Sequence, residues 1–491
     1  MNTFMHNLEN ATNYGYTENG AVKRVTTNSA VYDMFAFMGA YRKRRDEDCI
    51  LLFKNAFEED PLLALKCLFY GRDCRGGLGE RRFFRVCLRW LAEYNPKVVR
   101  RNLEHIPFFG RWDDLYILMD TPVEKDVFEL IKNQLILDMQ DCMKDKNTGI
   151  SLLGKWLKSE NASSAETKKL AKKTREALGM TARDYRKMLS RLRERIKVLE
   201  KLMSANRWEE IDFSKIPSKA GLIYRNAFAR RDIIAERYTA FARDKETKVN
   251  AATLYPYEVV KKALGLRYSY NLSNTDRLMV NKYWENLPDY LEGKDCKMMC
   301  VVDTSGSMVG TPINVAISLG MYCAERLSGP FSNRYISFSR RPQLIKVEGI
   351  DFVDKVIRIY RTNLCENTNL NAVFDLLLNV ALDKNTRKED IPETIVVISD
   401  MEIDCGSNWM SKKAETEMEK MRTKWAAYGM TMPRLIYWNV DARHNTILDS
   451  GPNVTFVSGA SPVIFKSVLT GKNGYDLMLE AITADRYNVI K

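Results

Sequence analysis

The chain has 491 residues, of which 45% are hydrophobic, and this excludes wholesale disorder and leaves room for two or three domains. It has no run approaching the ~20 apolar residues of a membrane-spanning helix, and its first twenty residues lack the pattern of a secretion signal, so we expect a soluble, cytoplasmic protein without a membrane partner. The three histidines are isolated and none of the ten cysteines forms a CxxC pair, which argues against a histidine-based centre and against a zinc site.

The positive charge is concentrated ahead of residue 296. The whole chain carries a net charge of +13, but residues 296–491 hold 23 basic and 22 acidic residues, so the part before them carries +12. Such asymmetry favours contact between the first part and a polyanion, most simply nucleic acid. The alternative is an ordinary solvated helical surface rich in lysine and arginine.

Residues 1–28 are polar and indicate an N-terminal arm, and residues 29–290 have the apolar spacing of helices. Breaks between helices are expected at Asp60-Pro61, at Gly76 to Gly79 and at Asn95-Pro96. Short helices with such frequent breaks predict helix pairs stacked as a solenoid, although the repeat has no clean period.

Two segments of the helical part are candidates for contact with RNA. The loop from Arg72 to Arg82 combines glycines with basic residues ahead of a helix and could hold a phosphate, with a tight turn as the alternative. Its candidate ligands are Arg72, Arg75, Arg81 and Arg82. The segment from Phe108 to Tyr116 could stack RNA bases, but we expect its aromatic residues to be core, with Asp113 holding Arg111.

The best candidate for a phosphate-binding face is the basic helical stretch from Lys168 to Met203. It is interrupted before Thr181, a natural N-cap for the second helix. An apolar stripe that includes Met188 and Leu192 leaves the basic residues on another face. The candidate RNA ligands on this stretch are Lys172, Lys173, Arg183, Arg186, Lys187, Arg191 and Arg195.

Strand and helix patterns alternate from Cys296 onward and predict a Rossmann-like α/β domain over residues 296–491. Its first strand, Met298 to Val302, is the apolar run of a strand buried on both faces of a parallel sheet. Further strands are expected at 334–338, 343–347, 394–400, 434–440 and 454–457, and helices at 312–327, 352–360, 370–382, 411–428 and from 461 and 474.

Oxygen-bearing side chains follow two of these strands. Asp303, Ser305 and Ser307 alternate in the loop after the first strand, Asp400 ends another buried strand, and Thr368 precedes a helix. One carboxylate and two hydroxyl groups in one loop are hard donors suited to Mg²⁺ or Mn²⁺. The alternative is a serine-rich N-cap loop that binds no metal.

This pattern resembles the metal-ion-dependent adhesion site of von Willebrand factor A (vWA) domains. The resemblance implies that Ser305, Ser307 and Thr368 contact the cation directly. It further implies that Asp303 and Asp400 act directly or through water, and that an open position receives an acidic group of a protein partner.

A basic helical part joined to a vWA-like domain is similar to the architecture of the Ro (TROVE) family, in which a ring of HEAT-like repeats binds noncoding RNA. The stretches Asp60 to Arg82, Phe109 to Tyr116 and Ile216 to Ala220 also resemble a TROVE-related family of plants, bacteria and large DNA viruses. The resemblance implies a multidomain fold, with an α-helical HEAT-like domain at 29–290 and a vWA-like α/β domain at 296–491.

We therefore expect an RNA-binding scaffold whose metal site serves a protein partner, and not an enzyme. A protein-interaction module without RNA is the first alternative, and salt-dependent RNA affinity would separate the two. The second alternative is a Mg²⁺-dependent phosphotransfer enzyme similar to haloacid-dehalogenase-like phosphatases. It is disfavoured because Ser305 stands where those enzymes carry an aspartate as general acid.

Overall fold

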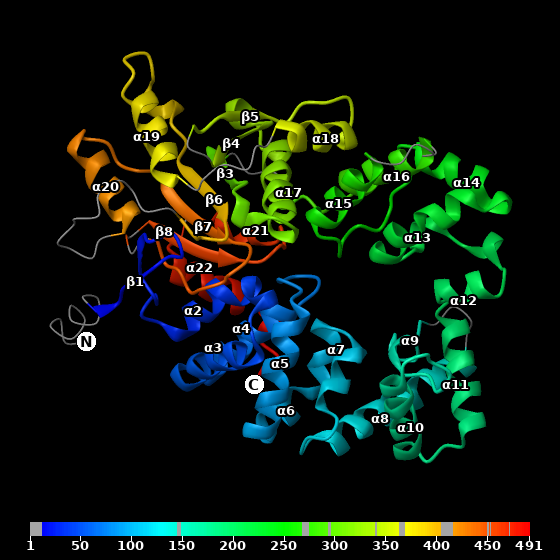
Figure 1. Ribbon diagram of the computed structural model, residues 1–491. Coiled ribbons are helices and arrows are strands. Elements are labelled where there is room, and N and C mark those ends of the chain that lie inside the picture. The colour runs from blue at the N-terminus through cyan, green and yellow to red at the C-terminus, as the bar shows by residue number, and fades with distance from the viewer. Residues whose placement is uncertain are drawn as a thin grey trace.

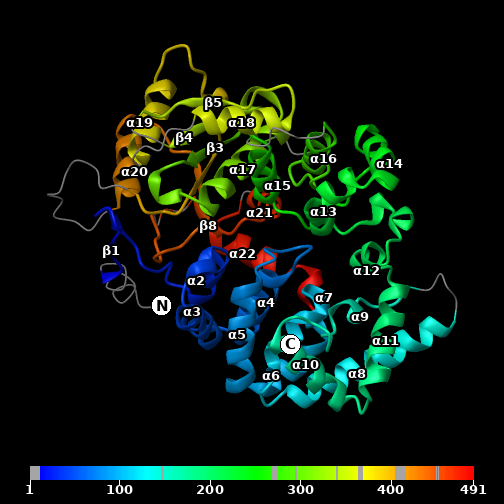
Figure 2. The ribbon, with the colours of Figure 1, turned by 45° about the vertical axis from the view of Figure 1, so that its right-hand side comes forward.

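The computed structural model describes residues 12–144, 149–267, 274–292, 296–338, 341–362, 369–403, 416–448, 451, 453–470 and 472–491. Its helices follow one another along an arc that begins and ends at an α/β unit, as two views of the ribbon show (Figure 1 and Figure 2). The expected order of a helical part followed by an α/β part is confirmed. Among the described residues, no helix is both long enough and apolar enough to cross a membrane.

The first part of the arc has its helix boundaries where the sequence predicts them. Asp60 caps the helix that Pro61 begins, by accepting the Leu63 N–H at 2.9 Å. Pro96 begins another helix, and the glycine-containing loop separates the two helices around it. The elements are α2 (Ala30–Phe37), η1 (Met38–Lys43), α3 (Asp46–Glu59), α4 (Pro61–Arg72), α5 (Arg81–Tyr94), α6 (Pro96–Asn102), η2 (Leu103–His105), α7 (Ile106–Phe109) and η3 (Trp112–Leu118).

The middle of the arc contains the basic helices. Thr181 accepts the Asp184 N–H and is the N-cap of the second of them, as predicted. This helix ends at Arg195, and two residues later Lys197 takes a left-handed backbone conformation with φ of 47°. The helical stretch is therefore broken a second time before Met203. The elements are α8 (Glu124–Met143), α9 (Leu153–Trp156), α10 (Ala165–Ala177), α11 (Ala182–Arg195) and α12 (Leu199–Ser204).

The last part of the arc returns to the α/β unit, because α15 packs against α17 and α18. Pro256 begins α15, and the Glu258 side chain accepts the backbone N–H of Tyr255, the residue before this proline, at 3.2 Å. The elements are η4 (Trp208–Glu210), η5 (Phe213–Lys215), α13 (Ser218–Arg230), α14 (Asp232–Arg243), α15 (Pro256–Leu266) and α16 (Asn274–Glu285).

The sheet has six strands in the order β5-β4-β3-β6-β7-β8, parallel except for β5 at the edge. The strands are β3 (Met298–Asp303), β4 (Arg334–Phe338), β5 (Leu344–Lys346), β6 (Thr394–Ser399), β7 (Arg434–Asn439) and β8 (Val454–Ser458). Because β3 and β6 are neighbours with Val302 opposite Ile398, the residues that follow them lie at the same edge of the sheet.

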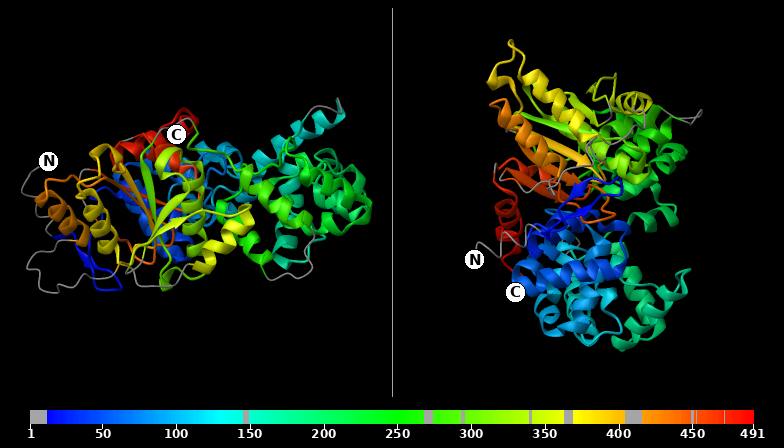
Figure 3. Two further views of the ribbon diagram at one scale, coloured as in Figure 1. Left: turned by 90° about the horizontal axis from the view of Figure 1, so that it is seen from above. Right: turned by 60° about the vertical axis from the view of Figure 1, so that its left-hand side comes forward.

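Helices cover both faces of this sheet (Figure 3). The helices of this unit are η6 (Gly306–Met308), α17 (Thr311–Arg326), η7 (Gly329–Phe331), α18 (Phe352–Thr362), α19 (Leu370–Ala381), η8 (Lys388–Asp390), α20 (Glu417–Ala427), α21 (Ile464–Val468), α22 (Gly474–Ile482) and η9 (Asp485–Tyr487). The helix expected over 411–428 begins at Glu417, and residues 404–415 lie outside the described residues.

The first helices and the last ones are packed together. Helix α2 contacts β8 and α22, and α4 contacts α22 and η9. Phe109 stacks on Tyr487 with ring centroids 5.4 Å apart, and the Lys491 N–H donates to Asn102 Oδ1 at 2.9 Å. The helical arc is therefore closed through the α/β unit at both of its ends.

The N-terminal arm also lies on the α/β unit. Its strands β1 (Gly15–Tyr16) and β2 (Val22–Lys23) form a short antiparallel pair. Arg24 and Ile447 form an antiparallel bridge, with N···O distances of 2.8 and 3.0 Å. The arm is thus attached to the loop that follows β7, more than 400 residues later in the chain.

Candidate functional site

The structure places Asp303 and Asp400 together at the carboxyl edge of the sheet. Asp303 is fully buried, accepting the Ser399 hydroxyl at 2.5 Å and the Ser305 N–H at 2.9 Å. Burial raises the pKa of Asp303 to about 6, and the neighbouring Asp400 carboxylate adds to this shift. Two carboxylates near each other in a water-poor site are electrostatically unfavourable, so a cation there would be stabilising.

Two hydroxyl groups complete the described part of this site. Ser305 Oγ and Ser307 Oγ are 3.0 Å apart, the first side chain buried and the second exposed. Thr368, the fifth predicted ligand, lies outside the described residues. The structure thus brings Asp303, Ser305 and Ser307 into one loop beside Asp400, and the loop opens to solvent at Ser307.

Asp400 has a cationic partner that the sequence pattern did not indicate. Arg443 approaches Asp400 Oδ2 with one guanidinium nitrogen at 2.6 Å and Glu18 with the other at 2.6 Å. Glu18 belongs to the N-terminal arm, and its N–H donates to Glu402 Oε2 at 2.9 Å. No local signal relates these residues, because Glu18 and Arg443 are 425 positions apart.

Much of the carboxyl edge of the sheet is covered by the chain itself. The loops after β7 and β8 contact η1 and its neighbours, with Lys43 paired to Asp441 at 2.6 Å and the Gly39 N–H donating to Ser458 Oγ at 2.9 Å. On the side of β6, Thr17 donates its hydroxyl proton to the Ile403 carbonyl at 2.9 Å.

A second candidate site is a cavity of about 1880 Å³ between the helical arc and the α/β unit. Its walls come from the loops after α4, α7 and α11, from α9, from the starts of α13 and α15, and from residues 461–463. Twelve basic and four acidic residues line it, and eleven of the twelve basic residues precede residue 296. The charge excess of the first part of the chain is therefore carried in part by this cavity.

The basic residues of the cavity fall into two groups. Arg72 and Arg85 share Asp114, and five others are paired with carboxylates: Arg42, Arg82, Lys215, Lys219 and Arg486. Five more have no carboxylate within ion-pair distance in the described part of the chain: Arg75, Arg81, Arg111, Lys155 and Lys197. The second group is available to an anionic ligand.

Aromatic side chains accompany these cations. Tyr255 and Tyr257 are stacked with their ring centroids 5.7 Å apart, and the Arg42 guanidinium lies 5.7 Å from each ring. Trp112 and Trp156, both half-buried, also line the cavity. Such a wall offers both phosphate-binding groups and ring faces.

The eleven predicted RNA ligands do not form one surface. Arg75, Arg81 and Arg82 line the cavity. Arg72 lines it as well, but its side chain is only 2% exposed and is bound to Asp114, so it holds the helices together. The remaining seven lie on α10 and α11 and do not line the cavity: Lys172, Lys173, Arg183, Arg186, Lys187, Arg191 and Arg195.

The basic residues on α10 and α11 differ in exposure and in ion pairing. Lys173 is paired with Asp120 and Glu124 at 2.6 and 2.5 Å, whereas Arg183, Arg186, Lys187 and Arg191 are exposed. These four exposed residues of α11 are called the outer basic face below.

The expectation that Asp113 holds Arg111 is wrong. Asp113 is paired with Arg85 at 2.5 Å and with Lys158 at 3.4 Å, and the Arg111 guanidinium instead lies over Trp156, 4.9 Å from the ring centroid. Proximity in sequence favoured Asp113, but the helix packing brings Arg85 closer. Sequence reasoning therefore missed Arg111 and, with it, Lys155 as functional candidates.

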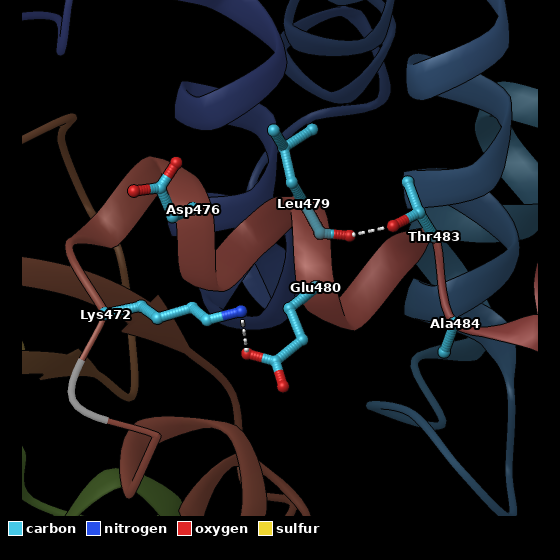
Figure 4. Close-up of a pocket in the computed structure, with 6 residues that line it drawn as sticks. All are labelled: Lys472, Asp476, Leu479, Glu480, Thr483 and Ala484. Carbon is cyan, nitrogen blue, oxygen red and sulfur yellow. Dashed lines mark hydrogen bonds and ion pairs between the residues drawn. The ribbon is translucent and has the colours of Figure 1, made fainter.

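A smaller hollow of about 670 Å³ lies along α22 (Figure 4). Lys472 and Glu480 face each other across it at 3.4 Å, and the Thr483 hydroxyl donates to the Leu479 carbonyl at 2.6 Å. Because these polar groups are satisfied by one another, this hollow is not a candidate site.

Two family models match the chain. The first, described as Domain of unknown function (DUF2828), matches residues 17–151 and 139–295. The second, described as Domain of unknown function (DUF7788), matches residues 297–487.

A viral protein and a solved structure are also similar to the chain. The uncharacterized protein L728 of Acanthamoeba polyphaga mimivirus is 29% identical over 507 residues, which cover 94% of this chain and 85% of that protein. The crystal structure of the Deinococcus radiodurans RO (RSR) protein aligns with 91% of this chain and 100% of its own, at 13% identity and a TM-score of 0.37.

Proposed function

The chain belongs to the family described as Domain of unknown function (DUF2828), and because that membership names no activity, we propose from the geometry that the protein is an RNA-binding scaffold. The observation that carries this proposal is the cavity between the helical arc and the α/β unit, with twelve basic and four acidic lining residues. A water-filled site with such an excess of positive charge attracts polyanions.

The composition of the cavity wall supports a nucleic acid as the polyanion. Arginines bind phosphates through paired N–H groups, and aromatic rings stack on bases without regard to their sequence. Arg75 and Lys197 have no carboxylate within ion-pair distance in the described part of the chain, and Tyr257 and Trp112 stand on the same wall. The choice of RNA follows the resemblance of the helical part to TROVE modules, and we expect binding with little base preference.

Fluorescence anisotropy with labelled structured and single-stranded RNAs tests this proposal. RNA affinity should fall by at least tenfold between 50 and 200 mM salt, since several phosphate contacts release counterions. The double variant Arg75→Gln/Lys197→Gln should weaken binding, whereas the matched variant Arg186→Gln/Lys187→Gln on the outer basic face should not. Absence of RNA binding at 50 mM salt would refute the proposal, and an effect of the outer variant alone would move the site to α11.

The second part of the proposal is a cation site in the α/β unit. Asp303, Ser305, Ser307, Thr368 and Asp400 would hold Mg²⁺ or Mn²⁺, which would leave a position open for a carboxylate of a protein partner. The fit is supported by the burial of Asp303, by the nearness of Asp400 and by the two hydroxyl oxygens 3.0 Å apart. We assign the site to binding and not to catalysis, since Ser305 cannot serve as a general acid.

Calorimetric titration with Mn²⁺ tests the cation site. Asp303→Ala should abolish Mn²⁺ binding while the circular dichroism spectrum stays unchanged, and Ser305→Ala should weaken binding. The control is Asp390→Ala, which removes a surface carboxylate paired with Arg387 in the same unit. Wild-type Mn²⁺ affinity in Asp303→Ala would refute the assignment of these residues.

A protein-interaction module without RNA is the second candidate function. The observation that favours it is the opening of the cation site at Ser307, which is exposed, whereas the other three described ligands, Asp303, Ser305 and Asp400, are buried. Titration of the Mn²⁺-loaded protein with an acidic peptide distinguishes the two, because this candidate requires peptide binding in a protein that fails to bind RNA.

A further inference from the structure

Two cationic side chains from distant parts of the chain meet at one ring on the cavity wall, and a third lines the same cavity. Arg81 begins α5, Arg111 precedes η3, and Lys155 lies in α9. The Arg111 guanidinium is 4.9 Å from the centroid of the Trp156 ring, and Lys155 Nζ is 5.6 Å from the same centroid. Arg81 is exposed and lines the same cavity, and its positive charge is one of the causes that lower the pKa of Arg111.

The carboxylates next to this cluster are already neutralised by other cations. Asp114 accepts Arg72 Nε at 2.8 Å and Arg85 Nε at 2.7 Å. Asp113 is paired with Arg85 and with Lys158. Arg72, Arg85 and Lys158 therefore already neutralise the two aspartates. The positive charges of Arg81, Arg111 and Lys155 are left without a carboxylate partner in the described part of the chain.

The environment of Arg111 reflects this excess. Burial lowers the pKa of the Arg111 guanidinium, and the positive charges of Arg81 and Arg72 lower it further. The residue is nevertheless held in place, because its backbone N–H donates to Asp114 Oδ2 at 2.9 Å and its guanidinium lies over Trp156. A positioned, uncompensated guanidinium facing a solvent-filled cavity is a preorganised anion site.

We propose that Arg81, Arg111 and Lys155 form a phosphate-binding subsite in which the arginine over Trp156 donates two N–H groups to phosphate oxygens. The subsite rests on the proposed function, since its natural phosphate belongs to RNA in the cavity. That phosphate is either an internal phosphodiester or a terminal monoester, and these two share the chemistry that the subsite recognises. Arg72, although nearby, is not a ligand because Asp114 occupies it.

The first test is anisotropy with a labelled 12-nucleotide single-stranded RNA at several salt concentrations. Arg111→Gln and Arg81→Gln should each weaken binding about 5- to 10-fold and reduce the slope of log affinity against log salt by about 0.7, the loss expected for one phosphate contact. Arg111→Lys keeps the positive charge but loses the paired N–H groups of the guanidinium, so its RNA affinity should lie between those of Arg111→Gln and the wild type. The control is Arg101→Gln, an exposed arginine on α6 that does not line the cavity.

The second test uses inorganic pyrophosphate in calorimetry and does not depend on RNA. Wild-type protein should bind pyrophosphate, and Arg111→Gln should bind it at least 5-fold more weakly, with Arg101→Gln unchanged. The two proposals fail in different ways. If the protein binds pyrophosphate but no RNA, the RNA function alone is refuted. If Arg111→Gln, Arg81→Gln and the control all bind RNA equally well, the subsite is refuted.

The two sources of phosphate are separated by RNAs that differ only at their ends. If a 5′- or 3′-terminal phosphate raises wild-type affinity and the gain disappears in Arg111→Gln, the subsite binds a terminal monoester. If the end groups make no difference while Arg111→Gln still weakens binding, it binds an internal phosphodiester. Unchanged thermal melting of Arg81→Gln, whose side chain is exposed, guards against an effect of misfolding.

Discussion

Asp114 is the residue whose replacement should most clearly reveal how the first helices are held together. It is fully buried and accepts Arg72 Nε at 2.8 Å, Arg85 Nε at 2.7 Å and the Arg111 backbone N–H at 2.9 Å, and its Oδ2 lies 2.7 Å from Arg72 Nη2 in an ion pair. Asp114→Asn keeps the shape of the side chain but removes its charge. The change leaves Arg72, 2% exposed, as a buried guanidinium without a counter-ion.

The expected loss is about 3–5 kcal/mol in the free energy of unfolding, the cost of removing one partner from a buried ion pair. Urea unfolding followed by circular dichroism measures it. Because a chain of 491 residues need not unfold in one step, the transition midpoints are compared. The control is Asp126→Asn, which breaks a pair with Arg100 whose side chains are 41% and 37% exposed, and it should cost at most about 1 kcal/mol. Equal midpoints for the two variants would refute the reasoning.

Two further predictions concern packing and burial. Gly39→Ala should lower stability by about 1–3 kcal/mol, since the added Cβ would lie against the Ser458 carbonyl oxygen, closer than van der Waals contact allows; thermal melting measures this, and Gly265→Ala, with open space around it, should not destabilise. Similar melting of both variants would contradict this packing. Burial raises the pKa of the Cys67 thiol, so it should resist alkylation by iodoacetamide in the native protein, while the half-buried Cys74 reacts, as mass spectrometry would show. Equal labelling of both thiols would count against the burial of Cys67.

The sequence was most informative where the physical signal is local. Asp60-Pro61 and Asn95-Pro96 mark helix starts because capping and the missing proline N–H act within one turn. The apolar run ending at Asp303 marks a buried strand because such a strand is covered on both faces. These features predicted the order of helical and α/β parts, which the structure confirms.

Contacts between residues that are far apart in the sequence could not be predicted from sequence patterns. Arg111 stands two residues before Asp113, and sequence alone favoured their pairing, but Arg85 on the facing helix takes Asp113. In the same way, the contact of Glu18 with Arg443 depends on how the arm crosses the sheet edge. The candidate cation site was found because its residues follow neighbouring strands. The cavity was not predicted, because its lining comes from many short segments; the sequence showed only the charge excess ahead of residue 296.

The packing of α2 and α4 against β8 and α22 has a consequence for synthesis of the protein. A nascent chain displays these early helices before residues 454–482 have left the ribosome, a delay of roughly 20–70 s at ordinary rates of translation. During that interval α2 and α4 can pack against each other, α3 and α5, but their faces toward β8 and α22 stay uncovered, so this part of the molecule is completed only after translation of α22.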